Sequence, residues 1–232
     1  MQISVVVPCY NESQVIAKTV KKIKSFLQEN YSDFEIIIID DKSTDNTLEI
    51  IKKINNTKVL RNLKNHGKGY SVKKGVRAAK GDWILFMDAD SSTDISELNK
   101  LSKYQDKYKL IIGSRALADS EIKIKQSLFK ILLGKLGNLL VRIILITNIR
   151  DTQCGFKLFH KDLQKLFNKL TIDDWGFDFE LIYLAKKHSF RIKEVGINWY
   201  NHPDSKVKWY AYLVTLLQVF KVRLNILINK YK

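Results

Sequence analysis

Apolar and polar positions follow a repeated order through the first half of the chain, in which a short apolar run precedes a longer amphipathic segment. The apolar runs predict buried parallel strands at residues 3–7, 36–39, 58–60, 83–87 and 110–112. The segments between them repeat apolar residues at helical spacing, and they predict helices over 15–27, 47–54 and 98–104 and over a segment that ends at Ala79. Strands that alternate with helices predict an α/β fold with a mostly parallel, doubly wound sheet.

Two long amphipathic segments give the second half of the chain a different character. One spans about 123–146 and the other 207–232, and each sets a stripe of apolar residues beside lysines and arginines. Helices of this kind lie in membrane interfaces, although two helices packed on a sheet produce the same pattern. The apolar stretch 209–220 is shorter than the roughly 20 residues of a membrane span, and the N-terminus lacks the basic region of a signal peptide. We therefore expect no transmembrane helix.

The charge balance indicates an anionic partner. The 232 residues include 40 Lys and Arg against 24 Asp and Glu, which gives a formal net charge of +16. This excess suits a nucleic acid, an anionic membrane surface or a phosphorylated substrate. A nucleic-acid partner is disfavoured because the sequence contains no helix-turn-helix, zinc-finger or RNA-recognition pattern. The two cysteines, Cys9 and Cys154, have no metal-binding spacing and favour a reducing, cytosolic compartment.

Acidic clusters follow two of the apolar runs. Asp40 and Asp41 come directly after 36–39, and Asp88-Ala89-Asp90 comes directly after 83–87. In an open α/β sheet, ligands bind at the carboxyl ends of the strands. Residues i and i+2 of an extended segment project to one side, so Asp88 and Asp90 are able to face one ligand. Carboxylates suit Mg²⁺ or Mn²⁺, which would bridge the diphosphate of a nucleotide sugar. The sequence thus predicts a nucleotide-sugar enzyme.

Ordered motifs at matching intervals extend this interpretation over nearly the whole chain. They occupy residues 7–12, 40–47, 65–69, 88–90, 113–115, 151–157 and 175–181. With these motifs the chain resembles family 2 glycosyltransferases of the GT-A fold. Within that family it looks like the polyprenyl-phosphate branch, which includes dolichyl-phosphate glucosyltransferases and dolichol-phosphate mannose synthases. The resemblance implies a GT-A catalytic domain over 1–206, with a nucleotide-binding half (1–115) and an acceptor-binding half (116–206), and a basic amphipathic helix over 207–232.

The resemblance also implies roles for single residues. Asp90 would be the main metal ligand and Asp88 would lie near the ribose and the metal, while Asp40 would accept a hydrogen bond from the base. The other implied contacts with the nucleotide sugar fall on Pro8, Tyr10, Glu12, Lys68, Ala89, Arg115 and Lys206. The catalytic residues would be Asp90, Arg115 and Asp178.

The acceptor decides whether a general base is needed. A sugar hydroxyl needs one, whereas a phosphomonoester is already largely anionic at neutral pH because its second pKa is about 6. A polyprenyl-phosphate acceptor instead needs cations, and the acceptor candidates are Arg142, Gly155 and Lys157, with Arg150 beside them. Asp178 is then an orienting or electrostatic residue, and a role as general base is the alternative. The reaction should be a single inverting displacement at the anomeric carbon.

Two functions remain in competition at this point. The first is a peripheral enzyme at the cytoplasmic face of a membrane, which moves a hexose from a nucleotide sugar to a polyprenyl phosphate. The second is a soluble transferase that extends a glycan, with Asp178 as base. The segments 175–178 and 197–199 favour UDP-glucose as donor and leave GDP-mannose open. The oligomeric state is not readable from the sequence.

Overall fold

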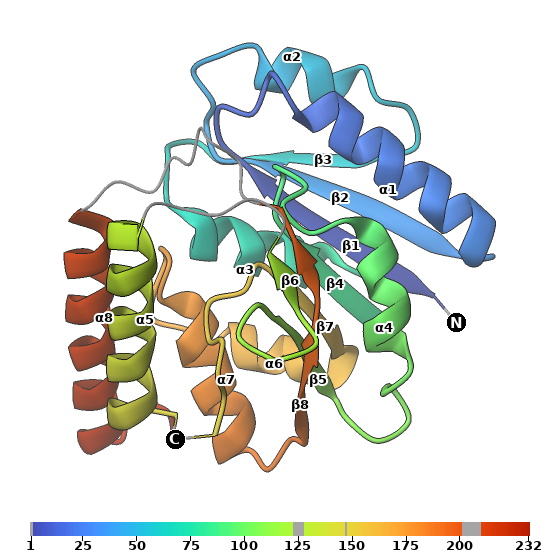
Figure 1. The fold of residues 1–232 in the computed structure, drawn as a ribbon. Coiled ribbons are helices and arrows are strands. Elements are labelled where there is room, and N and C mark those ends of the chain that lie inside the picture. Colours follow the sequence, from blue (N-terminus) through green and yellow to red (C-terminus); the bar gives the residue numbers. More distant parts are fainter. Residues whose placement is uncertain (1, 123–127, 147, 201–209) are drawn as a thin grey trace.

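A computed structural model describes residues 2–122, 128–146, 148–200 and 210–232 (Figure 1). In chain order the elements are β1 (Ile3–Cys9), α1 (Ile16–Asn30), β2 (Phe34–Asp40), α2 (Thr47–Lys52), β3 (Lys58–Arg61), α3 (Lys68–Ala78), β4 (Trp83–Met87), η1 (Ile95–Glu97), α4 (Leu98–Ser102), β5 (Leu110–Ser114), β6 (Glu121–Ile122), α5 (Leu128–Ile144), β7 (Phe156–His160), η2 (Lys161–Leu163), α6 (Gln164–Phe167), α7 (Phe177–Lys187), β8 (Ile192–Gly196), β9 (Asn198–Trp199) and α8 (Tyr210–Leu227).

The main sheet has the strand order β3-β2-β1-β4-β7-β5-β8. Its strands run parallel except β7, which is antiparallel to both β4 and β5. The apolar runs that predicted strands became β1 to β5, so the expected mostly parallel α/β sheet is confirmed. The later strands β6 to β9 were not predicted. β6 and β9 form a separate two-stranded ribbon.

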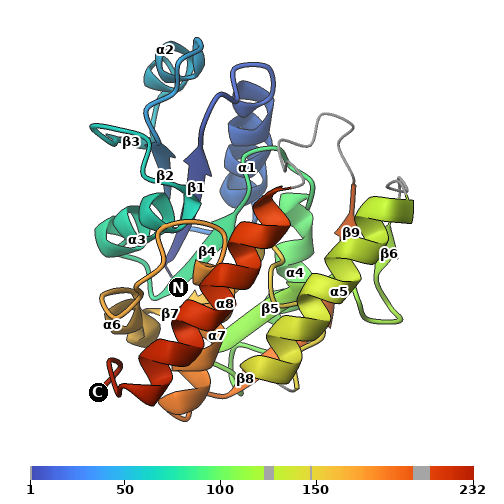
Figure 2. The same ribbon diagram turned by 90° about the vertical axis from the view of Figure 1, so that its left-hand side faces the viewer.

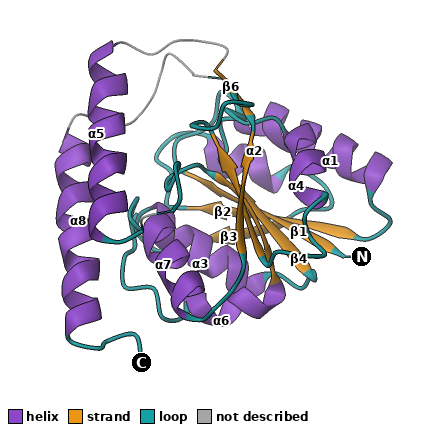
Figure 3. Ribbon diagram, turned by 60° about the horizontal axis from the view of Figure 1, so that its bottom comes forward, coloured by secondary structure: helices purple, strands orange, loops and turns teal. Residues whose placement is uncertain are grey.

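Both faces of the sheet are covered by helices (Figure 3). Every residue of β1 is buried, and alternate side chains of the strand enter different cores. Ile3, Val5 and Val7 pack in a core with apolar residues of α1, α2 and α4. Val6 packs on the opposite face with residues of α3, α6 and α7. A continuous apolar run is therefore what this two-sided position requires.

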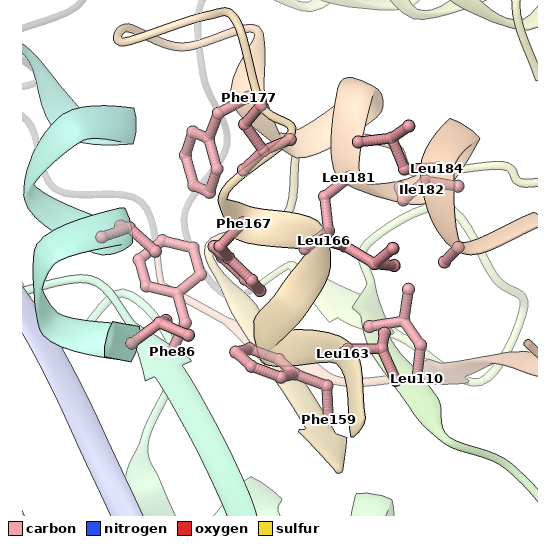
Figure 4. Close-up of a cluster of buried hydrophobic side chains, with 14 of the residues drawn as sticks. Phe86, Leu110, Phe159, Leu163, Leu166, Phe167, Phe177, Leu181, Ile182 and Leu184 are labelled. Carbon is pink, nitrogen blue, oxygen red and sulfur yellow. The ribbon is translucent and has the colours of Figure 1, made fainter. Parts of the chain in front are cut away.

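Aromatic side chains fill the core beneath α6 and α7 (Figure 4). Phe86 of β4 meets Phe177 of α7 edge-on, with ring centroids 5.6 Å apart. Phe159 of β7 stacks on Phe167 of α6 at 5.1 Å. These contacts fix the start of α7 against the end of β4, where the acidic cluster begins.

Helices α5 and α8 lie side by side at one flank of the molecule (Figures 1 and 2). The predicted helix over 123–146 is observed as Leu128–Ile144, and residues 123–127 lie outside the described residues. Val219 and Val222 of α8 are buried in the core that α7 shares. Among the described residues, no helix has the length and apolar character needed to cross a bilayer.

Candidate active site

Parallel strands bring the predicted site residues to one edge of the sheet. β1 ends at Cys9, β2 at Asp40, β4 at Met87 and β5 at Ser114. These four strands run in the same direction, so the loops that follow them meet at the carboxyl edge. The acidic clusters therefore lie at the edge where an open α/β sheet binds ligands.

The loops after β1 and β2 are joined by hydrogen bonds. Asn11 adopts a left-handed backbone (φ 55°), and its side-chain oxygen accepts a hydrogen bond from the Thr44 amide at 2.8 Å. The Glu12 amide donates to Thr47 Oγ1 at 2.7 Å. Burial would raise the pKa of Asp45, but hydrogen bonds from Thr47 and Ser13 lower it to about 2. The two loops thus form one hydrogen-bonded wall, and the carboxylate of Asp45 ties that wall together and accepts a hydrogen bond from the Thr47 amide at the start of α2.

The carboxylates of Asp40 and Asp41 accept hydrogen bonds within this wall. The Asp40 side chain is completely buried and accepts hydrogen bonds from the Ser43 amide (3.1 Å) and from Arg61 Nε (3.2 Å). Asp41, which was not predicted as a site residue, accepts from Asn62 Nδ2 at 2.7 Å and from the amides of residues 66 and 67. It therefore positions the loop that leads to Lys68. Its place directly after Asp40 was the available signal.

Lys68 and Asp88 form the central ion pair of the site. Lys68 Nζ lies 2.7 Å from Asp88 Oδ1, and the same ammonium lies 5.2 Å from the ring centroids of Phe86 and Trp175. Burial disfavours the charged ammonium, but the carboxylates of Asp88 and Asp178 outweigh burial and raise the pKa of Lys68. Lys68 is thus a permanent cation beside the acidic cluster.

Gly155 lies directly against the Asp88 carboxylate. Its carbonyl accepts a hydrogen bond from the Asp88 amide at 3.1 Å, and a Cβ on Gly155 would lie 1.9 Å from Asp88 Oδ2. No side chain fits there. Gly155 was predicted to contact the acceptor, and that contact stays a prediction; the structure shows that the residue makes room for the Asp88 carboxylate.

Asp88 and Asp90 fit a divalent cation that takes further oxygens from a bound diphosphate. Among the described residues, no three His, Cys, Asp or Glu side chains gather closely enough to enclose a metal alone. The Asp88 side chain is 33% exposed and pairs with Lys68 through Oδ1, while Asp90 Oδ1 accepts from the Ser92 amide at 2.9 Å. Ala89 between them is buried, and its carbonyl accepts from Thr19 Oγ1. Within the described part of the chain, the second oxygen of each aspartate has no other side-chain partner, so it suits a ligand such as a divalent cation.

A buried ion pair lies beneath this cluster. Lys157 of β7 is fully buried, and its Nζ is bonded to Asp178 Oδ1 and to the Cys154 carbonyl. A lysine enclosed in this way has no access to a lipid phosphate, so the predicted acceptor role of Lys157 is wrong. Burial raises the pKa of Asp178, although Lys157 opposes the rise. Asp178 is enclosed with Lys157 and has no surface on which to meet an acceptor hydroxyl.

The side chain of Arg115 forms an ion pair with Asp151. Asp151 belongs to the motif 151–157 but was not predicted as a site residue. Arg115 Nε and Nη2 donate to the two oxygens of Asp151 at 2.7 and 2.9 Å, and the guanidinium lies 5.4 Å from the ring centroid of Trp199. Burial would raise the pKa of Asp151, but Arg115 lowers it. One edge of the guanidinium is therefore occupied by Asp151, and 33% of the Arg115 side chain remains exposed.

A second cationic feature lies beside Arg115, between α5 and the loop that leads to Asp151. This open pocket of about 550 Å³ is lined by Ala116, Asn138, Leu139, Arg142 and Arg150. Arg142 Nε is buried and has no hydrogen-bond partner among the described residues. Asn138 ties α5 to the loop, because it donates to the Arg150 carbonyl and accepts from Thr152 Oγ1. We call this feature the two-arginine pocket.

The remaining predicted contacts are distributed as follows. Pro8 is buried within β1 opposite Ile39, Tyr10 is 39% exposed at the end of that strand, and Glu12 is partly buried in the loop after it. Lys206 lies outside the described residues. The contacts of these residues, and of Asp40, with a nucleotide stay predictions.

Comparisons with known proteins place the chain among glycosyltransferases. The model of the family "Glycosyl transferase family 2" matches residues 4–167. The chain is 31% identical to a dolichyl-phosphate beta-glucosyltransferase of Dictyostelium discoideum, over 99% of this chain and 76% of that protein. It is 36% identical to a dolichyl-phosphate beta-glucosyltransferase of Saccharomyces cerevisiae, over 88% of this chain and 69% of the other.

Solved structures share the fold. Mannosyl-3-phosphoglycerate synthase from Rubrobacter xylanophilus superposes with a TM-score of 0.73 at 15% identity, over 97% of this chain and 74% of that one. Glucosyl-3-phosphoglycerate synthase from Mycobacterium tuberculosis, in complex with Mn²⁺, UDP and phosphoglyceric acid, gives 0.73 at 18% identity, over 97% and 78%. These likenesses and the strand order confirm the expected GT-A fold.

Proposed function

The chain belongs to glycosyl transferase family 2, and from this premise we propose that it transfers glucose from UDP-glucose to the phosphate of a dolichyl-type polyprenyl phosphate. Relatives named dolichyl-phosphate beta-glucosyltransferase are at least 31% identical to the chain over most of its length. The proposal names a donor, an acceptor and a place, and each is supported by a different part of the structure.

One observation carries the proposal: the segment 150–155 joins a carboxylate cluster to a cationic pocket. Its last residue, Gly155, lies against the Asp88 carboxylate. Its first residue, Arg150, lines the two-arginine pocket. A site with carboxylates suited to a metal on one side and guanidinium groups on the other suits a reaction between two phosphate-bearing substrates.

On the donor side we assign Asp88 and Asp90 to a divalent cation, Mg²⁺ or Mn²⁺. When bound, such a cation supplies positive charge to the diphosphate as it leaves. Lys68 holds the Asp88 carboxylate in place and adds a second positive charge beside it. We assign Tyr10 and Glu12, which lie on the wall formed by the first two loops, to the base and ribose.

On the acceptor side we assign the two-arginine pocket to the lipid phosphate. Guanidinium groups bind phosphate through paired N–H donors, and both Arg142 and Arg150 line this pocket. In the reaction a phosphate oxygen forms a bond to the anomeric carbon while the bond from that carbon to the diphosphate breaks. The electron pair of the broken bond leaves with UDP, and the configuration at the carbon inverts.

No side chain has to remove a proton in this mechanism. The attacking phosphomonoester has a second pKa of about 6 and is largely a dianion at neutral pH. Asp178, the candidate base of the glycan-extending alternative, is buried against Lys157. We therefore give Asp178 an electrostatic role, in which it fixes Lys157 and contributes negative charge beneath Lys68. The glycan-extending alternative is not favoured.

We place the reaction at the surface of a membrane. α5 and α8 expose apolar residues along their described parts, and the most exposed are Leu217 (69%), Ile143 (67%) and Leu227 (65%). Large exposed apolar side chains gathered on neighbouring helices are typical of a surface that meets a membrane or a partner. Leu139 belongs both to this exposed surface and to the two-arginine pocket, so a lipid tail on α5 would leave its phosphate beside Arg142. Both cysteines are free and buried, which suits the predicted cytoplasmic face.

A transfer assay tests the proposal. The purified protein is incubated with Mn²⁺ or Mg²⁺, a short polyprenyl phosphate and either UDP-glucose or GDP-mannose, and the lipid phase is analysed by mass spectrometry. We expect a metal-dependent hexosyl phospholipid with UDP-glucose only. Asp90→Ala should lower the rate at least a hundredfold, because the carboxylate assigned to the metal is lost.

The assay tests the proposed donor and the proposed acceptor separately. Product with GDP-mannose alone would contradict the proposed donor. Absence of lipid product with both donors, together with transfer to a sugar hydroxyl, would contradict the proposed acceptor.

A further inference from the structure

Helix α8 has an outward face and an inward face that meet different parts of the molecule. Leu217 and Phe220 are 69% and 55% exposed, whereas the side chain of Gln218 points to the protein. Gln218 Oε1 accepts a hydrogen bond from the Gly176 amide at 2.8 Å. The approach is close, because a Cβ on Gly176 would lie 2.5 Å from Gln218 Oε1. Gln218 therefore fixes α8 to the turn that begins α7.

That turn also contacts the donor side of the site. Trp175, the residue before Gly176, lies with its ring centroid 5.2 Å from Lys68 Nζ. Lys68 in turn pairs with Asp88 at 2.7 Å. Two side-chain contacts thus separate the Gly176 turn from a carboxylate that we assign to the metal.

Backbone contacts join the same two segments. The Tyr70 amide donates to the Asp173 carbonyl at 2.9 Å, and Lys73 Nζ is paired with the Asp173 carboxylate. The segment 173–176 therefore lies against the first turns of α3, which carry Lys68. A shift of this segment would move Trp175 relative to Lys68.

The other end of α8 is anchored away from the Trp175 ring. Asn225 Nδ2 donates to Thr171 Oγ1 at 2.9 Å, and Tyr231 donates to Glu180 Oε1. The described contacts of Gln218 and of Asn225 are thus two separate attachments of one helix. Only the first one meets the turn that covers Lys68.

We propose that Gln218 is a positioning residue that couples the attachment of α8 to a lipid surface with the binding of the donor. This inference rests on the proposed function, since it needs both a membrane and a nucleotide sugar. A lipid surface that binds the docked form of α8 stabilises that form by mass action. Through Gln218 the docked helix holds the Gly176 turn, and Trp175 stays over Lys68.

The test measures donor binding instead of turnover. UDP-glucose with Mn²⁺ is titrated calorimetrically into the full chain, with and without vesicles of phosphatidylcholine and phosphatidylglycerol. We expect the vesicles to tighten donor binding by the wild type. Gln218→Met, which keeps the length of the side chain but lacks the acceptor, should bind the donor roughly fivefold more weakly and lose the vesicle effect. Gln218→Glu keeps an acceptor and should restore both.

Further variants separate coupling from stability. Asn225→Ala removes the hydrogen bond from α8 to Thr171 Oγ1, so it should lower the melting temperature and leave the vesicle effect in place. Trp175→Leu keeps Gln218 and should lose the vesicle effect, which tests the same link if Gln218→Met does not fold.

Each failure has a distinct signature. A wild type that binds UDP-glucose and transfers glucose, with Gln218→Met indistinguishable from it, overturns the inference and leaves the proposed function intact. A wild type that does not bind UDP-glucose overturns the proposed function itself.

Discussion

At the scale of single residues, ion pairs shape the carboxyl edge of the sheet. Lys68 pairs with Asp88, and two further pairs, Arg115–Asp151 and Lys157–Asp178, follow the same arrangement. A charge that is removed from water needs such a partner, because an uncompensated buried charge costs several kcal/mol. Each pair joins segments that are at least 20 residues apart in the sequence. The pairs therefore hold the loops of the site in one arrangement before any substrate binds.

The Arg115–Asp151 pair predicts a pH-dependent loss of stability. Arg115 lowers the pKa of Asp151 against the effect of burial, so the folded protein keeps this carboxylate ionised to a lower pH than the unfolded chain does. The contribution is fully present above the ordinary Asp pKa of about 3.9 and is lost as the pH falls through the lowered pKa. Asp151→Asn should lower the free energy of unfolding at pH 7 by about 3 kcal/mol.

Urea unfolding at several pH values measures this effect. The difference between wild type and Asp151→Asn should shrink as the pH falls below about 4. A difference that is the same at pH 3 and pH 7 would contradict the role of the ionised pair. The exposed Asp106, replaced by Asn, provides the control and should leave the stability at pH 7 nearly unchanged.

At the scale of elements, helix α8 has one buried face and one exposed apolar face. Val219 and Val222 are buried in the core, and Leu213, Phe220 and Leu224 are more than half exposed. This spacing follows the helical repeat, so the apolar stripe seen in the sequence faces away from the protein. The basic amphipathic pattern left two interpretations open, a membrane helix and a helix packed on the sheet. The inward face of α8 packs on the core, and we propose the outward face for the membrane.

Phe220→Asp tests the outward face. The ring is 55% exposed, so its removal should change the free energy of unfolding by no more than about 0.5 kcal/mol. Affinity for anionic vesicles should fall at least tenfold, because a buried aromatic side chain contributes about 1.5–3 kcal/mol and the new charge is repelled. Flotation with vesicles measures the bound fraction.

The matched control for this variant is Leu63→Asp. Leu63 is 93% exposed and lies between β3 and α3, away from α5 and α8. The Leu63→Asp variant should leave vesicle binding almost unchanged. Equal losses in both variants would mean that net charge alone governs the attachment.

At the scale of the whole molecule, the sequence predicted the half of the fold in which strands alternate with helices. Strands β1, β2, β4 and β5 contain continuous apolar runs, because both faces of each are covered, and such runs are visible without a structure. The edge strand β3 is shorter and only partly buried. β7 was missed. It inserts antiparallel between β4 and β5, and its sequence Phe-Lys-Leu-Phe-His carries a lysine in a position that is completely buried.

The site was also predicted in part: its local motifs were identified, and its contacts between distant residues were not. The motifs named Asp88, Asp90 and Lys68, because strand ends and acidic clusters are local features of the chain. The environments of Lys157 and Gly155 depend on Asp178 and Asp88, which are distant in the sequence, so neither the burial of Lys157 nor the closeness of Gly155 to Asp88 was predicted. The two-arginine pocket is likewise formed by α5 and a later loop, and only its geometry brings Arg142 and Arg150 together.

The division of the site into a donor side and an acceptor side is the central claim, and two-substrate kinetics of the Arg142→Ala/Arg150→Ala variant test it most directly. The KM for polyprenyl phosphate should rise tenfold or more, since charge-assisted hydrogen bonds contribute about 1.5–3 kcal/mol each. The KM for UDP-glucose should stay within about twofold of the wild type, as should both constants of Arg191→Ala, an exposed arginine before β8. A raised KM for UDP-glucose with an unchanged KM for the lipid would contradict the account.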